Sequence, residues 1–183
     1  MNKIKKLSRK AKIALAGFCI IVIVMAVGIF GLTNQNPGTT QSVATDTVSP
    51  TTGTSSPNVT AGYTTKVDSI IESTKTDLND SYTVLQNYAN GEIDVNTAIS
   101  HLQKDKTSLN NAIAEIQSLT PPQNLQNYHN LLVSAFQDLN QALSLEISGV
   151  QNNDMNDIQS AADLTNNAVS KIKEAKKERN QTS

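Results

Sequence analysis

One uninterrupted apolar segment constrains this chain more than any other feature. Residues 13–32 read IALAGFCIIVIVMAVGIFGL, twenty residues without a charged side chain. A helix rises about 1.5 Å per residue, so a helix of this length spans the roughly 30 Å hydrocarbon core of a bilayer. The segment is therefore predicted to be a single transmembrane helix, which places the protein at the cell membrane.

The charges on either side of this segment predict its orientation. Residues 1–12 carry six Lys or Arg and no Asp or Glu, whereas residues 63–183 carry nine Lys or Arg against fifteen Asp or Glu. Basic residues next to a membrane helix stay on the cytoplasmic side. We expect residues 1–12 to form a cytoplasmic basic tail and everything after Leu32 to be extracytoplasmic. The acidic balance of the second region also makes nucleic acid an unsuitable partner.

A cleaved signal peptide is the alternative for the same segment. Ala26-Val27-Gly28 has the small-x-small pattern of a cleavage site, and cleavage near Gly28 would release a secreted protein. The apolar residues continue through Leu32, beyond the usual length of a signal-peptide core, which favours retention as a signal anchor. Cys19 is the single cysteine of the chain, so no intramolecular disulfide and no cysteine-based zinc site can form.

Residues 33–62 have a different composition. They hold thirteen Ser or Thr, three Pro and three Gly, and their longest apolar side chains are scattered valines. Such a segment cannot bury enough apolar surface to fold, so it is predicted to be a disordered linker. A flexible chain of this length spans roughly 30 Å, which would hold a following domain clear of the lipid headgroups.

From residue 63 to residue 180, apolar residues recur every three or four positions in four successive stripes, the pattern of amphipathic helices. The first stripe stops at the Asn-Gly pair 90–91, a typical helix end. Asp94 is the expected N-cap of the second helix. The Pro-Pro pair 121–122 stops that helix, and the polar residues 152–154 separate the third helix from the fourth.

These stripes predict an all-α fold. The expected connections are only a few residues long, which favours antiparallel neighbours, and no strand-like alternation is present. The prediction is an antiparallel up-down four-helix bundle over residues 63–180. The fourth stripe is the weakest, because it is built largely from alanine, so a three-helix bundle with a loose fourth helix is the alternative.

The two histidines are the first candidates for a metal site. Counting residues from a turn near Pro121 places His129 about 18 Å from His101, too far to share an ion. The same counting places His129 near Glu72 and Glu174, the three residues that would form a weak metal or proton site. A histidine at a helix start is more often a packing residue, so we expect no metal and no cofactor.

Basic residues crowd the last stripe of the chain. They are Lys171, Lys173, Lys176, Lys177 and Arg179. Both ends of an even-numbered up-down bundle lie at one pole, so this cluster would face the membrane and contact anionic lipid or a cell-wall polymer. In the alternative interpretation, the cations complement the dipole at a helix C-terminus and lie on a solvated face.

A loose pattern in the second half of the chain resembles a group of known proteins. It comprises Pro121-Pro122, then His129 with Leu131-Leu132, then Ala135, followed by the alanine-rich last helix. This pattern, over about residues 105–175, resembles small, uncharacterised bacterial ectodomains that are carried on single membrane anchors or lipid tails. The resemblance implies an extracytoplasmic location and a helical fold, and it supplies no activity.

The sequence holds no Ser-His-Asp arrangement, no glycine-rich phosphate loop and no defensible pair of catalytic carboxylates, so we expect no enzyme. The main functional hypothesis is a tethered helical module for protein interaction or envelope scaffolding, bound to another envelope or membrane protein. The alternative is a small-ligand or metal-binding sensor domain that acts through a membrane partner.

Overall fold

The computed structural model of the chain describes residues 57–181, which form four α-helices, one 3-10 turn and no strand. The elements are α2 (Pro57–Asn90), α3 (Val95–Ser118), η1 (Gln123–Leu125), α4 (Gln126–Asn152) and α5 (Met155–Gln181). The predicted basic tail, transmembrane helix and most of the predicted linker lie outside the described residues. Within residues 57–181, no helix is both long and apolar enough to cross a bilayer.

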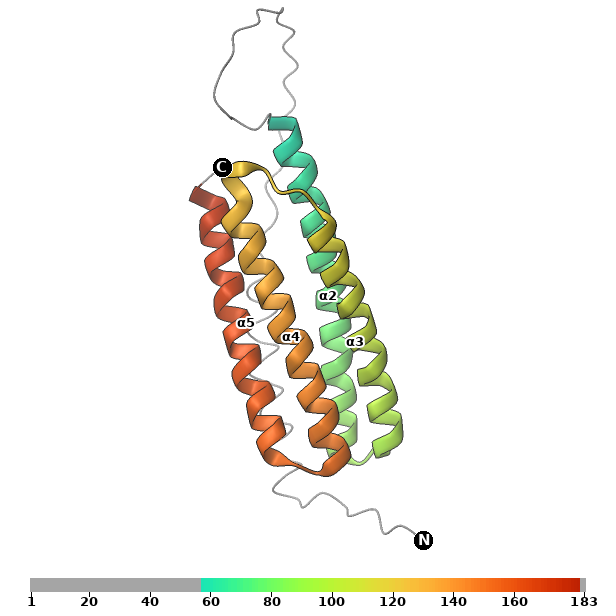
Figure 1. Cartoon of the computed structure of the whole chain (residues 1–183). Helices are drawn as coiled ribbons and strands as arrows, with labels where there is room; N and C mark the ends of the chain where they lie inside the picture. The colour runs from blue at the N-terminus through green and yellow to red at the C-terminus, as the bar shows by residue number, and fades with distance from the viewer. Residues whose placement is uncertain (1–56, 182–183) are drawn as a thin grey trace, which may run out of the picture.

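The four helices run alternately down and up, as the sequence predicts (Figure 1). The first turn of α2 and the last turn of α5 lie at the same pole, and the α2–α3 and α4–α5 connections lie at the opposite pole (Figure 1). The all-helical fold is therefore confirmed for the described part of the chain. Helix α2 begins at Pro57, six residues before the boundary at residue 63 that the stripes indicate.

The ends of α2 and α3 follow the local sequence signals. Gly91 has a φ of 79°, and the Glu92 N–H donates to the carbonyl of Asn87 at 2.8 Å, which closes the last turn of α2. The Asp94 carboxylate then accepts a 2.8 Å hydrogen bond from the Thr97 N–H at the start of α3. This hydrogen bond holds the pKa of Asp94 below its usual value.

Helix α4 continues past Gly149 and ends at Asn152. Asn153 caps its C-terminal end in the left-handed conformation, with φ 55° and ψ 43°. Gly149 lies inside the helix because α5 passes close to it. A Cβ atom at Gly149 would lie 2.6 Å from the Cδ1 atom of Ile158.

Helix α5 is not a loose fourth helix, so that alternative is wrong. It packs on α4 more closely than any other two helices pack in the described residues. The residues that it buries are mostly small, among them four alanines: Ala161, Ala162, Ala168 and Ala175. Small side chains let two helix backbones approach closely, so a stripe that is weak in hydrophobicity gives the tightest contact of the bundle.

The boundary between α2 and the α4–α5 hairpin is the widest of the bundle, and we call it the seam. Helix α2 packs on α3, and α3 on α4, but the backbones of α2 and α5 approach each other less closely than consecutive helices do. Two cavities lie along the seam, one of about 60 Å³ nearer the pole where α2 begins and one of about 40 Å³ nearer the α2–α3 connection. Val67, Tyr128, Leu132 and Phe136 are among the most buried residues of the core.

Candidate functional site

His129 is a buried packing residue of α4. Its side chain is 8% exposed, and its Nδ1 atom lies 2.9 Å from the hydroxyl oxygen of Tyr63 on α2. The Tyr63 ring also meets the ring of Tyr128 edge to face, with centroids 6.4 Å apart. Burial lowers the pKa of His129, which favours the neutral imidazole.

The structure does not bring His129 together with Glu72 and Glu174. Because Tyr63 lies opposite His129, Glu72 lies nine residues further along α2, about 14 Å away along the helix axis. Glu72 forms an exposed ion pair with Lys75 at 3.4 Å, and Glu174 is exposed on α5. Among residues 57–181, no three His, Cys, Asp or Glu side chains are arranged to hold a metal ion.

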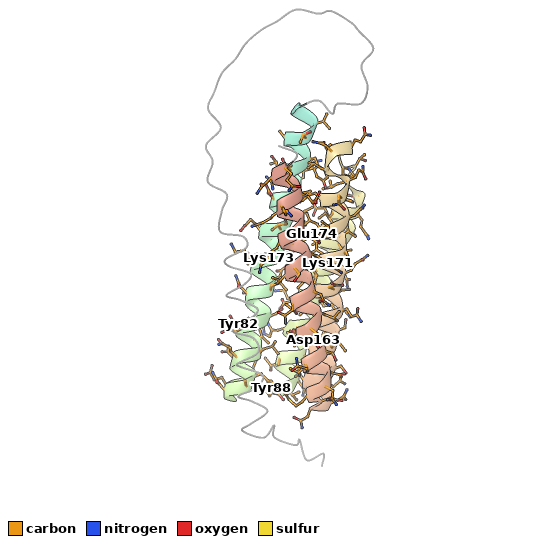
Figure 2. All side chains as sticks on the ribbon, turned by 90° about the vertical axis from the view of Figure 1, so that its left-hand side faces the viewer. Tyr82, Tyr88, Asp163, Lys171, Lys173 and Glu174 are labelled. Carbon is orange, nitrogen blue, oxygen red and sulfur yellow. The ribbon has the colours of Figure 1, made fainter. Side chains whose placement is uncertain are left out.

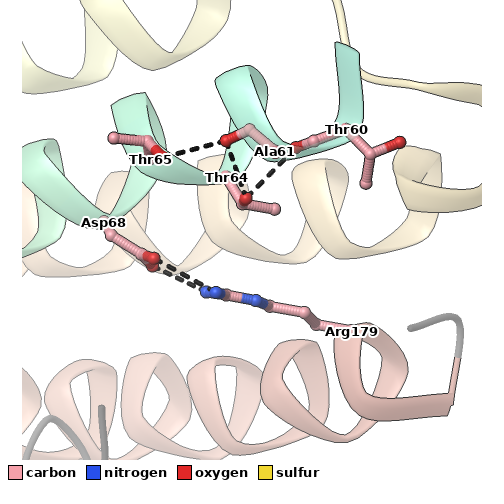
Figure 3. A network of polar contacts seen from close by, with 6 residues as sticks. All are labelled: Thr60, Ala61, Thr64, Thr65, Asp68 and Arg179. Carbon is pink, nitrogen blue, oxygen red and sulfur yellow. Dashed lines mark hydrogen bonds and ion pairs between the residues drawn. The ribbon is translucent and has the colours of Figure 1, made fainter. Parts of the chain in front are cut away.

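Two members of the basic cluster make cross-helix ion pairs. The Lys171 ammonium donates to the Asp138 carboxylate at 2.7 Å and to the Ser134 hydroxyl at 2.9 Å, both on α4. The Arg179 guanidinium donates to both oxygens of Asp68 on α2, at 2.6 and 3.1 Å (Figure 3). These contacts give both cations a structural role within the bundle.

The other three basic residues differ in exposure. Lys173 and Lys177 are exposed, and Lys173 and Lys171 lie in the half of α5 nearer its end (Figure 2). Lys176 is half-buried beside the Arg179–Asp68 pair, and burial is the main cause that lowers its pKa. Of the five predicted basic residues, two therefore form cross-helix ion pairs and two are exposed.

One cavity of the seam, of about 40 Å³, lies in the half of the seam nearer the α2–α3 and α4–α5 connections. Helix α2 contributes Leu78, Ser81, Tyr82 and Leu85, α4 contributes Leu139, Ala142, Leu143 and Glu146, and α5 contributes Thr165. A single water occupies about 10–15 Å³ on this scale, so the cavity has room for a small chemical group. The walls are mostly apolar, and the cavity is partly open to solvent.

Glu146 is the unusual member of this lining. Its side chain is partly exposed, and among the described residues its carboxylate has no hydrogen-bond or ion-pair partner. Burial raises its pKa from 4.5 to about 7. A carboxylate among apolar side chains is costly unless a partner compensates it, and such groups occur most often at functional sites.

A second buried carboxylate adjoins the cavity. Asp105 of α3 is 6% exposed and accepts a 2.7 Å hydrogen bond from the hydroxyl of Ser81, itself one of the cavity residues. Burial is the main cause that raises the pKa of Asp105, and the hydrogen bond from Ser81 partly opposes it. Asp105 therefore has a partner within the bundle, which Glu146 lacks among the described residues.

Glu146 is not among the candidate residues predicted from the sequence, although the sequence contains a signal for it. Glu146 falls on the buried stripe of α4, seven residues after Leu139 and three after Leu143. An acidic residue at a core position of a helix contradicts the hydrophobic pattern and marks a candidate site.

Comparison with models of protein families, with curated proteins and with solved structures gives no significant match for this chain.

Proposed function

We propose that this protein is a membrane-tethered, extracytoplasmic binding module rather than an enzyme. The apolar segment 13–32 would anchor it, and the basic residues 1–12 would keep its N-terminus in the cytoplasm. The position of both bundle ends at one pole supports this arrangement (Figure 1). A bundle tethered at that pole would direct its opposite pole and its sides away from the lipid.

We infer that the module binds a small molecule in the seam. The Glu146 carboxylate in the cavity, which has no partner among residues 57–181, is the observation that carries this proposal. A concave, mostly apolar site with a few polar groups is the usual form of a small-molecule site. A ligand there would touch α2, α4 and α5 together and draw α2 onto the α4–α5 hairpin. A membrane partner in contact with the bundle would respond to this change in the packing of α2.

Ligand-dependent stability of the full chain in detergent tests this function. We expect some members of a panel of small metabolites to raise the midpoint of thermal unfolding. Ala142→Leu would fill the cavity and abolish the shift, whereas Ala114→Leu, at an exposed position of α3, would keep it. If the active compounds shift both variants equally, they bind elsewhere and the seam is not the site.

Protein interaction or envelope scaffolding is the second candidate function. A polar groove of about 390 Å³ between α2 and α3 favours it. The groove is lined by Ser69, Ile70, Ser73, Asp77, Ser108, Asn111, Ala112 and Glu115. It ranks second because, among the described residues, only Val59 and Met155 are exposed large hydrophobic side chains, and interfaces usually have an apolar centre.

Cross-linking in intact cells separates the two candidates. Scaffolding predicts a reproducible protein partner that is lost when Asn111, an exposed residue in the groove, is replaced by Arg. Small-molecule binding predicts that this replacement leaves the ligand-induced thermal shift unchanged. Capture that persists with Asn111→Arg would remove the groove from consideration.

The predicted topology has its own test. Lys177 is exposed on α5, so a Lys177→Cys variant in a Cys19→Ser background offers one accessible thiol on the described domain. We expect a membrane-impermeant maleimide to label this thiol in intact cells. Labelling only after the cells are lysed would overturn the extracytoplasmic placement.

A further inference from the structure

Two of the three hydroxyl groups that line the cavity, those of Ser81 and Thr165, can only accept a further hydrogen bond. Ser81 donates its hydroxyl proton to Asp105 at 2.7 Å, and Thr165 donates its own to the carbonyl of Ala161 at 2.9 Å. Each hydroxyl oxygen therefore keeps lone pairs but has no proton left to donate. The Glu146 carboxylate, when ionised, also accepts only.

The remaining walls of the cavity suit an apolar group. Leu78, Leu85, Leu139 and Leu143 supply aliphatic surface from both sides of the seam, and Tyr82 supplies an aromatic ring. Tyr82 accepts a hydrogen bond from the Gln86 side-chain amide and is the one hydroxyl in the lining that keeps a proton to donate. An aromatic ring and a carboxylate in an apolar setting are both attractive to an organic cation.

We propose that the seam cavity binds a small organic cation, a protonated primary amine with a short apolar chain. The ammonium group would donate to the carboxylate of Glu146 and to the oxygens of Ser81 and Thr165, while the chain packs on the leucines. This inference rests on the proposed small-molecule function of the seam and names its ligand class. A protonated amine has three donors and no acceptor, which matches the acceptor groups of the cavity.

Other ligand classes match the lining less well. A divalent metal ion prefers several oxygen ligands with more than one carboxylate, and Glu146 is the only charged side chain among the described residues that line the cavity. An anion would be repelled by Glu146. A neutral apolar molecule would leave that carboxylate without a partner in a still drier environment.

Binding should depend on the ionisation of Glu146, because only the carboxylate form attracts a cation. The titratable groups around it are Tyr82 on α2, which lines the cavity, and Asp105 on α3, which reaches it through Ser81. The parts of α4 and α5 that line the cavity contribute no other titratable side chain. Affinity should therefore rise from pH 5.5 to pH 8, as Glu146 loses its proton.

The test uses n-butylammonium chloride as the probe in isothermal titration of the full chain in detergent, with empty micelles as the blank. Neutral n-butanol is the matched probe, since it has the same chain without the charge. We expect saturable binding of butylammonium at pH 8 and about tenfold or greater loss of affinity in Glu146→Gln. Glu174→Gln removes an exposed carboxylate from α5 and should bind like the wild type.

Three results would overturn the inference: no saturable butylammonium binding, equal binding of n-butanol, or unchanged affinity in Glu146→Gln. If n-butanol or a member of the metabolite panel binds in an Ala142-dependent manner while butylammonium does not, the ligand class is wrong and the seam remains a binding site. If no compound binds there, the proposed function fails as well. Unfolding midpoints of each variant show whether it is folded under the conditions of the titration.

Discussion

The guanidinium of Arg179, in the last turns of α5, donates hydrogen bonds to both carboxylate oxygens of Asp68 in α2, a residue 111 positions earlier in the sequence. This pair closes the seam at the pole where the described chain begins and ends (Figure 3). The two donor–acceptor distances are 2.6 and 3.1 Å, the two-pronged geometry that makes arginine–carboxylate pairs specific. This polar contact therefore connects α2 with α5 at the end of the seam that lies nearest the chain ends.

The first prediction concerns this ion pair. Arg179→Gln and Asp68→Asn should each lower the free energy of unfolding by about 0.5–1 kcal/mol, a modest value because both side chains are partly exposed. A double-mutant cycle by urea unfolding at low and high NaCl measures the coupling, which salt should weaken. Glu72→Gln breaks the exposed Lys75 pair on α2 and should cost less. Zero coupling at low salt would show that the pair does not close the seam.

The second prediction concerns His129 and pH. Burial lowers the pKa of His129 below 6.5, so the unfolded chain binds its proton more readily than the folded chain does. The stability that this residue contributes is present above pH 6.5 and is lost as the pH falls toward its lowered pKa. His129→Gln should flatten the pH dependence of the unfolding free energy between pH 7 and pH 5 relative to wild type.

Glu146 gives the third prediction, with the opposite sign. Its folded pKa of about 7 lies above the usual 4.5, so the folded chain holds the proton more tightly than the unfolded chain. Its contribution is present below pH 4.5 and is lost as the pH rises through 7. Glu146→Gln should therefore raise the free energy of unfolding by about 1–3 kcal/mol at pH 8 and change it little at pH 4.5.

Thermal unfolding at the two pH values checks this difference. A variant that gains stability at pH 8 while it loses butylammonium binding would separate a ligand-binding role from a structural one. An equal change of stability at both pH values would show that Glu146 is not desolvated in the folded chain.

The helix boundaries could be predicted largely from the sequence, because their signals are local. Asp94 and the Asn90-Gly91 pair mark their helix ends by hydrogen bonds that reach only a few residues. The close packing of α5 was not predicted. A hydrophobic stripe is recognised by its large apolar side chains. Ala161 and Ala168 instead allow α5 to pack closely on α4 because they are small.

The predicted layer of His129 was wrong by about nine residues on α2, because Tyr63 and not Glu72 lies opposite it. Counting from a turn assumes that the connecting residues add no length along the bundle. Between α3 and α4, however, Leu119 and Pro122 are extended, with ψ of 138° and 151°. Extended residues rise about 3.3 Å each, twice the helical value, so α4 begins well beyond the end of α3 (Figure 1).

The last prediction concerns the close approach of α4 and α5 at Gly149. Alanine there would place its Cβ atom 2.6 Å from Cδ1 of the buried Ile158 and 3.0 Å from the carbonyl oxygen of Asp154. Gly149→Ala should lower the free energy of unfolding by about 1–3 kcal/mol, although alanine is normally the better helix residue. Gly62 on α2 is the matched control, since a Cβ atom there meets nothing within 4 Å. Gly62→Ala should instead raise stability by about 0.4–1 kcal/mol.

Urea unfolding of both variants measures this difference, and a companion variant identifies its cause. Ile158→Ala removes both side-chain atoms that meet the new methyl group, Cδ1 at 2.6 Å and Cγ1 at 2.8 Å, at a cost of about 2–5 kcal/mol in the wild-type background. In the Gly149→Ala background the same change should cost less or restore stability, because the overlap is relieved. Additive costs would mean that the glycine is needed for backbone reasons and not for the packing of α5 on α4.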